Sequence, residues 1–122
     1  MIGEYSTEKL VETVVLGMQE KKANNIIVLN LRKTDNSICD YFVICDAQST
    51  TQVDAIADSI EELVQRNIGE KALHKEGFEN AQWILLDFMD VVVHIFQTES
   101  REFYNLEEFW EDAEKTEVVE IV

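Results

Sequence analysis

The strongest hydrophobic pattern in the chain lies in residues 81–97, which read AQWILLDFMDVVVHIFQ. Two aliphatic runs within it, residues 84–86 and 91–93, are too short to span a membrane and too rich in β-branched side chains to favour a helix. The stretch between them, residues 87–90, is DFMD. This pattern predicts two central strands joined by a tight turn. Turn tips are usually small and polar, so a tip with two large apolar side chains is a candidate contact surface.

Apolar positions in the rest of the chain predict three helices and three more strands. Leu10, Val14 and Met18 repeat at helical spacing. Ser49 and Gln52 have the spacing of a capping box at the start of a second helix. In chain order, we predict a helix over residues 7–22 capped by Ser6, strands over 25–31 and 41–46, a helix from the capping box to residue 67, a strand over 72–76, and the hairpin. An amphipathic helix then begins at Glu99 after a Thr98 cap. It carries Phe103, Leu106, Phe109 and Trp110 as one apolar stripe.

The predicted order of elements, α-β-β-α-β-β-β-α, indicates an α/β (α+β) sandwich in which helices flank a mixed sheet of about five strands. The sequence contains no linker, repeat or low-complexity tract, so we expect a single domain over residues 1–122. Strands on either side of the middle helix imply a right-handed parallel crossover. Residues 117–122 either add an edge strand or fray, within an acidic tail that begins at about residue 114.

The chain is strongly acidic, with a formal net charge of −15 over 122 residues. Nucleic-acid binding draws its affinity from clustered Lys and Arg, so we expect a basic protein partner and no direct nucleic-acid ligand. Cys39 and Cys45 lie beside or within an apolar strand, which is typical of reduced thiols in a cytosolic protein. The first residues lack the features of a signal peptide and no segment is long enough to span a bilayer, so we expect a cytoplasmic protein without membrane contact.

Candidate catalytic groups are few. Asp87 and Asp90 have a D-x-x-D spacing that suits Mg²⁺, but acids at a turn more often contact solvent or a partner. His94 interrupts a strand and is expected in the core or on the sheet face, and a Cys45–His94 pair has no third group to orient it. The sequence holds no P-loop, GxGxxG motif or zinc-spaced Cys/His set. We therefore expect no catalytic residue, no metal site and no cofactor.

Trp83 stands at the start of the first hairpin strand. Alternation places Leu85 on the same face of the sheet and Ile84 on the other, so the indole lies at the edge of the core. Core packing and a role as an interface anchor fit this position equally well, because exposed aromatic side chains are enriched at interfaces.

Three stretches carry a specific sequence signature. They are DYFVICDAQSTTQVDAIADSIEE at residues 40–62, WILLDFMDVVVHIF at 83–96 and ESREFYNLEEFW at 99–110. The most specific part is the block W-x-L-x-D-x-x-D-V-V-V-H followed by E-x-R-x-F-Y-x-L-E. In this order and spacing, covering about residues 10–113, they resemble the ribosomal silencing factor family, also called Iojap-like proteins.

The resemblance implies a domain similar to the nucleotidyltransferase fold but without its catalytic acids. It also implies a translational repressor that binds the large ribosomal subunit through the subunit's fourteenth protein and blocks joining with the small subunit when nutrients are short. The family's partner contacts fall on Trp83, Asp87, Phe88 and Asp90, and we include Met89 in the predicted partner-binding set. Two alternatives remain open: a nucleotidyltransferase-like enzyme that uses the two acids on Mg²⁺, and a generic acidic interaction module.

This chain departs from the family pattern at two places. Family members usually carry glycine where this chain has Met89, so the turn either avoids positive φ or stores strain. The loop at residues 46–52 keeps the capping serine but lacks the usual glycine and arginine.

A homodimer through the same apolar surface would compete with ribosome binding. The pattern leaves open whether Arg32 and Lys33 touch ribosomal RNA.

Overall fold

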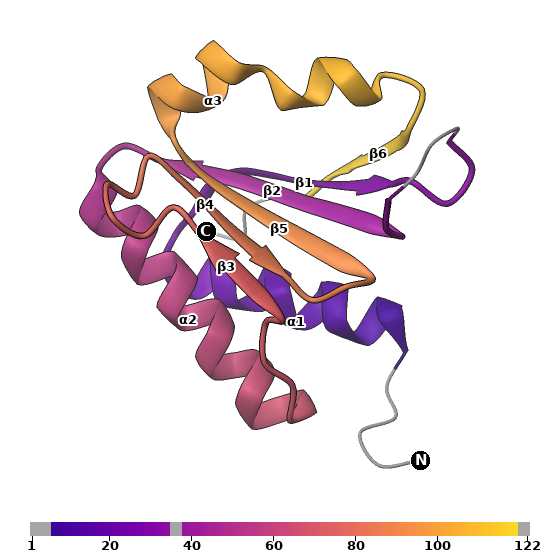
Figure 1. Ribbon diagram of the computed structural model, residues 1–122, viewed down its shortest axis with the longest axis horizontal. Coiled ribbons are helices and arrows are strands. Elements are labelled where there is room, and N and C mark those ends of the chain that lie inside the picture. Colours follow the sequence, from indigo (N-terminus) through magenta and orange to yellow (C-terminus); the bar gives the residue numbers. More distant parts are fainter. Residues whose placement is uncertain (1–5, 35–37, 120–122) are drawn as a thin grey trace.

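The computed structural model describes residues 6–34 and 38–119. A six-stranded sheet separates two layers, with α1 and α2 on one face and α3 on the other (Figure 1). The predicted α/β class is confirmed, with six strands in place of about five. The elements in chain order are α1 (Thr7–Glu20), β1 (Asn24–Asn30), β2 (Tyr41–Ala47), α2 (Thr50–Ile68), β3 (His74–Glu76), β4 (Trp83–Asp87), β5 (Val91–Gln97), α3 (Thr98–Tyr104), the 3₁₀ helix η1 (Leu106–Trp110) and β6 (Glu114–Glu117).

The strands lie in the order β3-β4-β5-β2-β1-β6. β2 and β5 pair in parallel, with Ile44 opposite His94, and the other neighbouring pairs are antiparallel. The predicted hairpin is formed by β4 and β5, and β5 lies in the interior of the sheet. Because β3 is antiparallel to β4, it points in the same direction as β2, as expected for strands on either side of a crossover helix.

The sixth strand, β6, begins three residues before the position expected for an edge strand. It pairs with β1, placing Glu117 opposite Ile27 and Glu114 opposite Asn30. The strand is exposed along its whole length, so it carries none of the apolar alternation from which strands are predicted. Residue 114 therefore belongs to the sheet edge and not to a free tail, while residues 120–122 lie outside the described residues. Charged side chains on an edge strand oppose pairing with a second chain.

Alternation along the strands divides the apolar side chains between two cores. The first core lies between the sheet and α1 and α2, and the second lies between the sheet and the α3–η1 segment. Figure 1 shows the two layers on opposite sides of the strands. The first core includes Leu10, Val14, Met18, Val43, Cys45, Ile56, Ile60, Ile84, Leu86, Val91, Val93 and Ile95. The second core comprises Ile27, Leu29, Leu31, Phe42, Ile44, Val92 and Phe96, with Trp83, Leu85, Leu106 and Trp110 packed against it.

The two long helices pack closely because of a glycine in α1. A Cβ on Gly17 would lie only 2.8 Å from the Cα of Ile60 in α2, so a larger side chain would force the helices apart. The Ser59 hydroxyl donates a hydrogen bond to the Gly17 carbonyl at 2.9 Å. α1 ends at Glu20 and not at residue 22 because Lys22 adopts φ of +57°, which ends the helical conformation. These contacts fix the helical layer that supports the central hairpin.

Candidate partner-binding surface

The turn between β4 and β5 is tight and strained. The Phe88 amide donates to the Val91 carbonyl at 2.9 Å, and the Asp90 amide donates to the Phe88 carbonyl at 3.1 Å. The second bond spans Met89, whose φ is +81°. A three-residue turn closed over a positive φ is rare and costly for a residue with a Cβ. From the sequence, the turn at Met89 was expected either to avoid positive φ or to store strain. The structure shows the second alternative, because Met89 adopts positive φ.

Phe88 does not lie where the sequence placed it. We expected its ring to be exposed at the turn tip as a partner anchor, but it is only 5% exposed and belongs to the first core. The alternation that sends Ile84 and Leu86 toward the helices continues through Phe88. Met89 is the apolar residue at the tip that faces solvent, with 64% of its surface exposed.

Replacing Met89 with Gly is expected to raise the free energy of unfolding by about 1 kcal/mol. The gain is the relieved backbone strain, of order 1–3 kcal/mol, less the extra entropy of glycine in the unfolded chain. Denaturant unfolding measures it. Met89→Ala is the matched control, because it removes the same side chain but keeps the Cβ at φ of +81°. Equal stabilisation by both substitutions would show that the strain is not the cause.

Trp83 lies on the face of the sheet opposite α1 and α2, at the start of β4. Its indole stacks on Phe96 with ring centroids 4.8 Å apart and contacts Tyr104 of α3 at 5.0 Å. Its Nε1 donates a hydrogen bond to His94 Nδ1 at 3.1 Å. The ring remains partly exposed, so Trp83 both packs on the second core and reaches the surface. The core packing is therefore confirmed, while the role as an interface anchor stays a prediction that the partial exposure permits.

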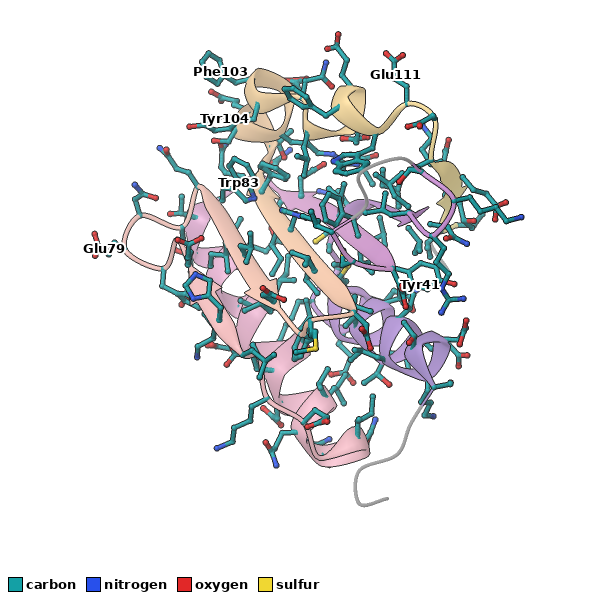
Figure 2. All side chains as sticks on the ribbon, turned by 45° about the vertical axis from the view of Figure 1, so that its right-hand side comes forward. Tyr41, Glu79, Trp83, Phe103, Tyr104 and Glu111 are labelled. Carbon is teal, nitrogen blue, oxygen red and sulfur yellow. The ribbon has the colours of Figure 1, made fainter. Side chains whose placement is uncertain are left out.

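Two aromatic side chains of α3 extend the exposed area beside Trp83. Tyr104 is 47% exposed and Phe103 is 81% exposed, and their rings meet edge to face at 5.1 Å. In Figure 2, Tyr104 of α3 lies above Trp83, and Phe103 lies beyond Tyr104 on the outer side of the helix. A contiguous group of three partly or fully exposed aromatic rings is uncommon on a monomer surface that has no partner.

The predicted stripe of the last helix is split. α3 ends at Tyr104, and Asn105 with φ of +46° separates it from η1. The change of direction lets Leu106 and Trp110 pack on the second core while Phe103 and Phe109 remain exposed. One continuous amphipathic helix was therefore the wrong expectation, and the exposure of Phe103 follows from the break.

We define the β4 surface as Trp83, Leu85, Asp87, Met89, Asp90, Phe103 and Tyr104. The first three point to one face of β4 by alternation, and Trp83 is separated from Asp87 by about 13 Å along the strand. The Asp87 carboxylate accepts a hydrogen bond from the Met89 amide at 2.8 Å, which ties the strand end to the turn. The β4 surface thus contains four of the five predicted partner-binding residues and excludes Phe88.

The β4 surface is acidic as well as apolar. Asp87 and Asp90 supply negative charge within it, and the exposed Glu102 precedes Phe103 in α3. The Lys75 ammonium lies 3.3 Å from the Glu61 carboxylate of α2, on the other face of the sheet. Such a combination of aromatic rings and acids is complementary to a basic surface with apolar recesses.

Arg32, the cation whose contact with RNA the sequence left open, is engaged within the chain. Its guanidinium lies 3.1 Å from Glu8, 3.5 Å from Asp40 and 5.0 Å from the centre of the Tyr41 ring. Tyr41 lies across the molecule from Trp83 in Figure 2. Arg32 is therefore paired with acidic side chains of the same chain, whereas the Lys33 side chain is exposed.

His94 is buried beneath Trp83. It is 4% exposed, and its ring meets Phe42 edge to face at 4.6 Å. Burial disfavours the charged imidazolium and lowers the pKa of His94 to about 3. Cys45 faces the other core, because residues on paired strands alternate and Cys45 lies opposite Ile95. The Cys45–His94 pair considered from the sequence is therefore not formed.

The depressed pKa of His94 predicts a loss of stability in acid. The unfolded chain binds a proton below about pH 6.5, whereas the folded ring stays neutral to about pH 3, so the free energy of unfolding falls as pH falls between these values. At pH 5.5 this one group should cost about 1.3 kcal/mol relative to pH 7. His94→Asn, which does not titrate, should show a shallower decline in denaturant unfolding from pH 7 to 5.5. Identical slopes would contradict the assignment.

A buried ion pair holds α3 against the sheet. Arg101 Nη1 lies 2.9 Å from Asp46 Oδ2, and its Nε lies 2.9 Å from Glu107 Oε1. The side chains of Arg101 and Asp46 are only 11% and 3% exposed. Thr98, expected as a helix cap, is the first residue of α3, and its hydroxyl donates to Asp46 Oδ1 at 3.0 Å. This network positions the helix that carries Phe103 and Tyr104. The Arg101–Asp46 contact could not be predicted from the sequence, because the two residues are far apart along the chain.

The magnesium alternative finds little geometric support. One oxygen of Asp87 accepts the Met89 amide proton, which competes with a cation for that oxygen. Among residues 6–34 and 38–119, no group of three or more His, Cys, Asp or Glu side chains is arranged to hold a metal ion. In the same part of the chain no helix is long and apolar enough to cross a membrane.

Comparison with known proteins identifies the relatives of this chain. Residues 4–122 match the family model described as "Ribosomal silencing factor during starvation". Ribosomal silencing factor RsfS of Halalkalibacterium halodurans is 38% identical over 96% of this chain and 98% of its own length, and that of Bacillus subtilis is 37% identical over 87% and 88%. A crystal structure of a protein from Bacillus halodurans, 35% identical, superposes with a TM-score of 0.78 over 92% of this chain and 100% of its own.

Proposed function

The chain belongs to the ribosomal silencing factor family, and on that premise we propose that it binds the large ribosomal subunit through the subunit's fourteenth protein and so prevents joining with the small subunit. Family membership supports a ribosome-silencing role during starvation and a regulatory factor as opposed to an enzyme. The β4 surface is the face we assign to this contact. The role would place the protein in the cytoplasm.

The observation that carries this proposal is the exposed aromatic group beside acidic side chains. Trp83 presents part of its indole next to Tyr104 and Phe103, and rigid aromatic rings at the centre of a patch are typical anchors of protein interfaces. Asp87 and Asp90, farther along the same β4 surface, suit a basic partner. Phe88 is not among the anchors, because its ring is buried in the first core.

The proposed mechanism needs no chemical step. Occupation of a face of the large subunit excludes the small subunit sterically for as long as the factor stays bound. The aromatic contacts set the dissociation rate, and Asp87 and Asp90 at the end of β4 accelerate association by attracting the basic surface. The association rate should therefore fall as salt rises, while the dissociation rate changes less.

Cosedimentation with purified ribosomal subunits tests the proposal. The protein is expected to pellet with large subunits and to remain in the supernatant with small subunits alone. Binding to both subunits, or binding that disappears with modest salt and is indifferent to Trp83, would favour the generic acidic module instead. Binding to neither would remove the proposed function.

We propose in addition that any homodimer of this chain uses the β4 surface. An apolar area that awaits a partner is readily covered by a second copy, and twofold dimers are the commonest oligomers. Such a dimer would compete with the ribosome for Trp83. Analytical ultracentrifugation of the parent and of Trp83→Ala is expected to show weaker self-association of the variant, and unchanged self-association would place the dimer contact elsewhere.

A further inference from the structure

We infer that His94 is a positioning residue that fixes the indole of Trp83 in the orientation used for partner binding. This inference rests on the proposed function, because it assigns a second residue to the same contact. His94 itself is 4% exposed, so it acts through Trp83 and does not touch the partner. The two side chains project from paired strands, β4 and β5, on the same face of the sheet.

The hydrogen bond between the two rings determines which nitrogen of His94 carries the proton. Indole Nε1 is only a donor, so His94 Nδ1, at 3.1 Å, must be the acceptor and carry no hydrogen. The neutral ring then bears its proton on Nε2. That atom is buried and has no hydrogen-bond partner in the described part of the chain. An unsatisfied buried donor is costly, which indicates that the histidine serves something other than stability.

Simple core packing does not explain a histidine at this position. Its neighbours are aromatic or apolar, with Phe42 at 4.6 Å and Phe96 at 6.3 Å between ring centroids, and an apolar side chain would fill the same space without burying polar atoms. What an apolar side chain cannot supply is an acceptor beneath the indole. Without it, the contacts of the Trp83 ring with Phe96 and Tyr104 would remain, but neither of them accepts the indole N–H.

The hydrogen bond matters for binding because it pre-organises a partly exposed anchor. An interface side chain that is already held in its bound rotamer loses less entropy on association, a saving that corresponds to up to about tenfold in Kd per side chain. Loss of the acceptor should therefore weaken binding about tenfold even when the fold is intact. Asn is the conservative replacement, because its side-chain oxygen lies near the position of Nδ1.

The test compares His94→Phe, His94→Asn and Trp83→Ala in quantitative cosedimentation with purified large subunits. We expect His94→Phe to raise Kd about tenfold and His94→Asn to stay within about threefold of the parent. The indole N–H resonance of Trp83, assigned against the Trp83→Ala spectrum, should shift in His94→Phe and stay near its parental position in His94→Asn. This resonance reports the hydrogen bond directly. A general loss of packing would not explain a shift in His94→Phe that is absent in His94→Asn.

Each outcome separates the inference from the function on which it rests. If Trp83→Ala abolishes binding while His94→Phe binds like the parent, the proposed function stands and the inference is overturned. Equal losses in His94→Phe and His94→Asn would also overturn it, because the acceptor would not be the cause. If Trp83→Ala binds like the parent, the proposed surface itself is wrong. If His94→Phe fails to fold, His94→Leu takes its place under the same criteria. Trp83→Phe keeps an aromatic ring but has no N–H donor, so it should show the same tenfold rise in Kd. Parental binding by Trp83→Phe would overturn the inference.

Discussion

Replacing Arg101 with Met is expected to lower the free energy of unfolding by about 3–5 kcal/mol. The substitution leaves the carboxylate of Asp46 buried, with a side chain 3% exposed, and without its cationic partner. The hydrogen bonds that Asp46 accepts from Asn25 and Thr98 remain, but neither of these donors carries charge. Denaturant unfolding at neutral pH measures the loss. An effect below about 1 kcal/mol would show that the ion pair is not structurally important.

Two further variants separate the buried charge from the loss of a long side chain. Asp46→Asn combined with Arg101→Met removes both charges and is expected to recover part of the lost stability, because no unpaired ion remains. Arg66→Met is the matched surface control. Arg66 pairs with Glu62 one turn away in α2, with side chains 61% and 69% exposed, and such pairs contribute at most about 0.5 kcal/mol.

Replacing Trp83 with Ala is expected to weaken binding to the large subunit about 30-fold, which corresponds to about 2 kcal/mol. The substitution removes the ring at the sheet end of the exposed aromatic group and leaves Tyr104 without its neighbour at 5.0 Å. The loss should appear mainly as faster dissociation, since packed anchors act after encounter. Surface plasmon resonance with immobilised large subunits resolves the two rates.

The control for Trp83→Ala is an exposed apolar residue on the opposite layer. Leu16 in α1 is 51% exposed, and Leu16→Ala should leave both rates unchanged. Circular dichroism must show that Trp83→Ala is folded, because the indole also packs on Phe96. Asp90→Lys tests the same surface with little risk to the fold, since Asp90 is exposed, and should slow association at low salt. Parental kinetics in both surface variants would remove the β4 surface from the contact.

The elements that could be predicted from the sequence are those whose apolar pattern matches their period. The β4–β5 hairpin, the two long helices and the capping role of Ser49, which accepts the Gln52 amide, belong to this group. Strand β6 could not be predicted at its observed position, because all four of its residues are exposed and no alternation marks it. The final helix was misread because its division at Asn105 depends on a residue that adopts positive φ.

The candidate site shows the same division between local and long-range causes. Alternation along β4 placed Trp83 at the edge of the core, and the structure confirms that position, with the indole packed on the second core and partly exposed. Its role in partner binding stays a prediction. Alternation also explains the error at Phe88, since the pattern that buries Leu86 continues one step into the turn. Phe103 and Tyr104 were missed as neighbours of Trp83, because their position depends on Asp46 and Arg101, which are 55 residues apart in sequence.

The central claim is that occupation of the large subunit through the β4 surface prevents subunit joining. Light scattering of purified subunits, with the factor added to large subunits before small subunits, measures this directly. The parent protein and Leu16→Ala are expected to suppress the increase in scattering, whereas Trp83→Ala at the same concentration should allow it. Normal joining in the presence of saturating parent protein, or equal suppression by folded Trp83→Ala, would contradict the account.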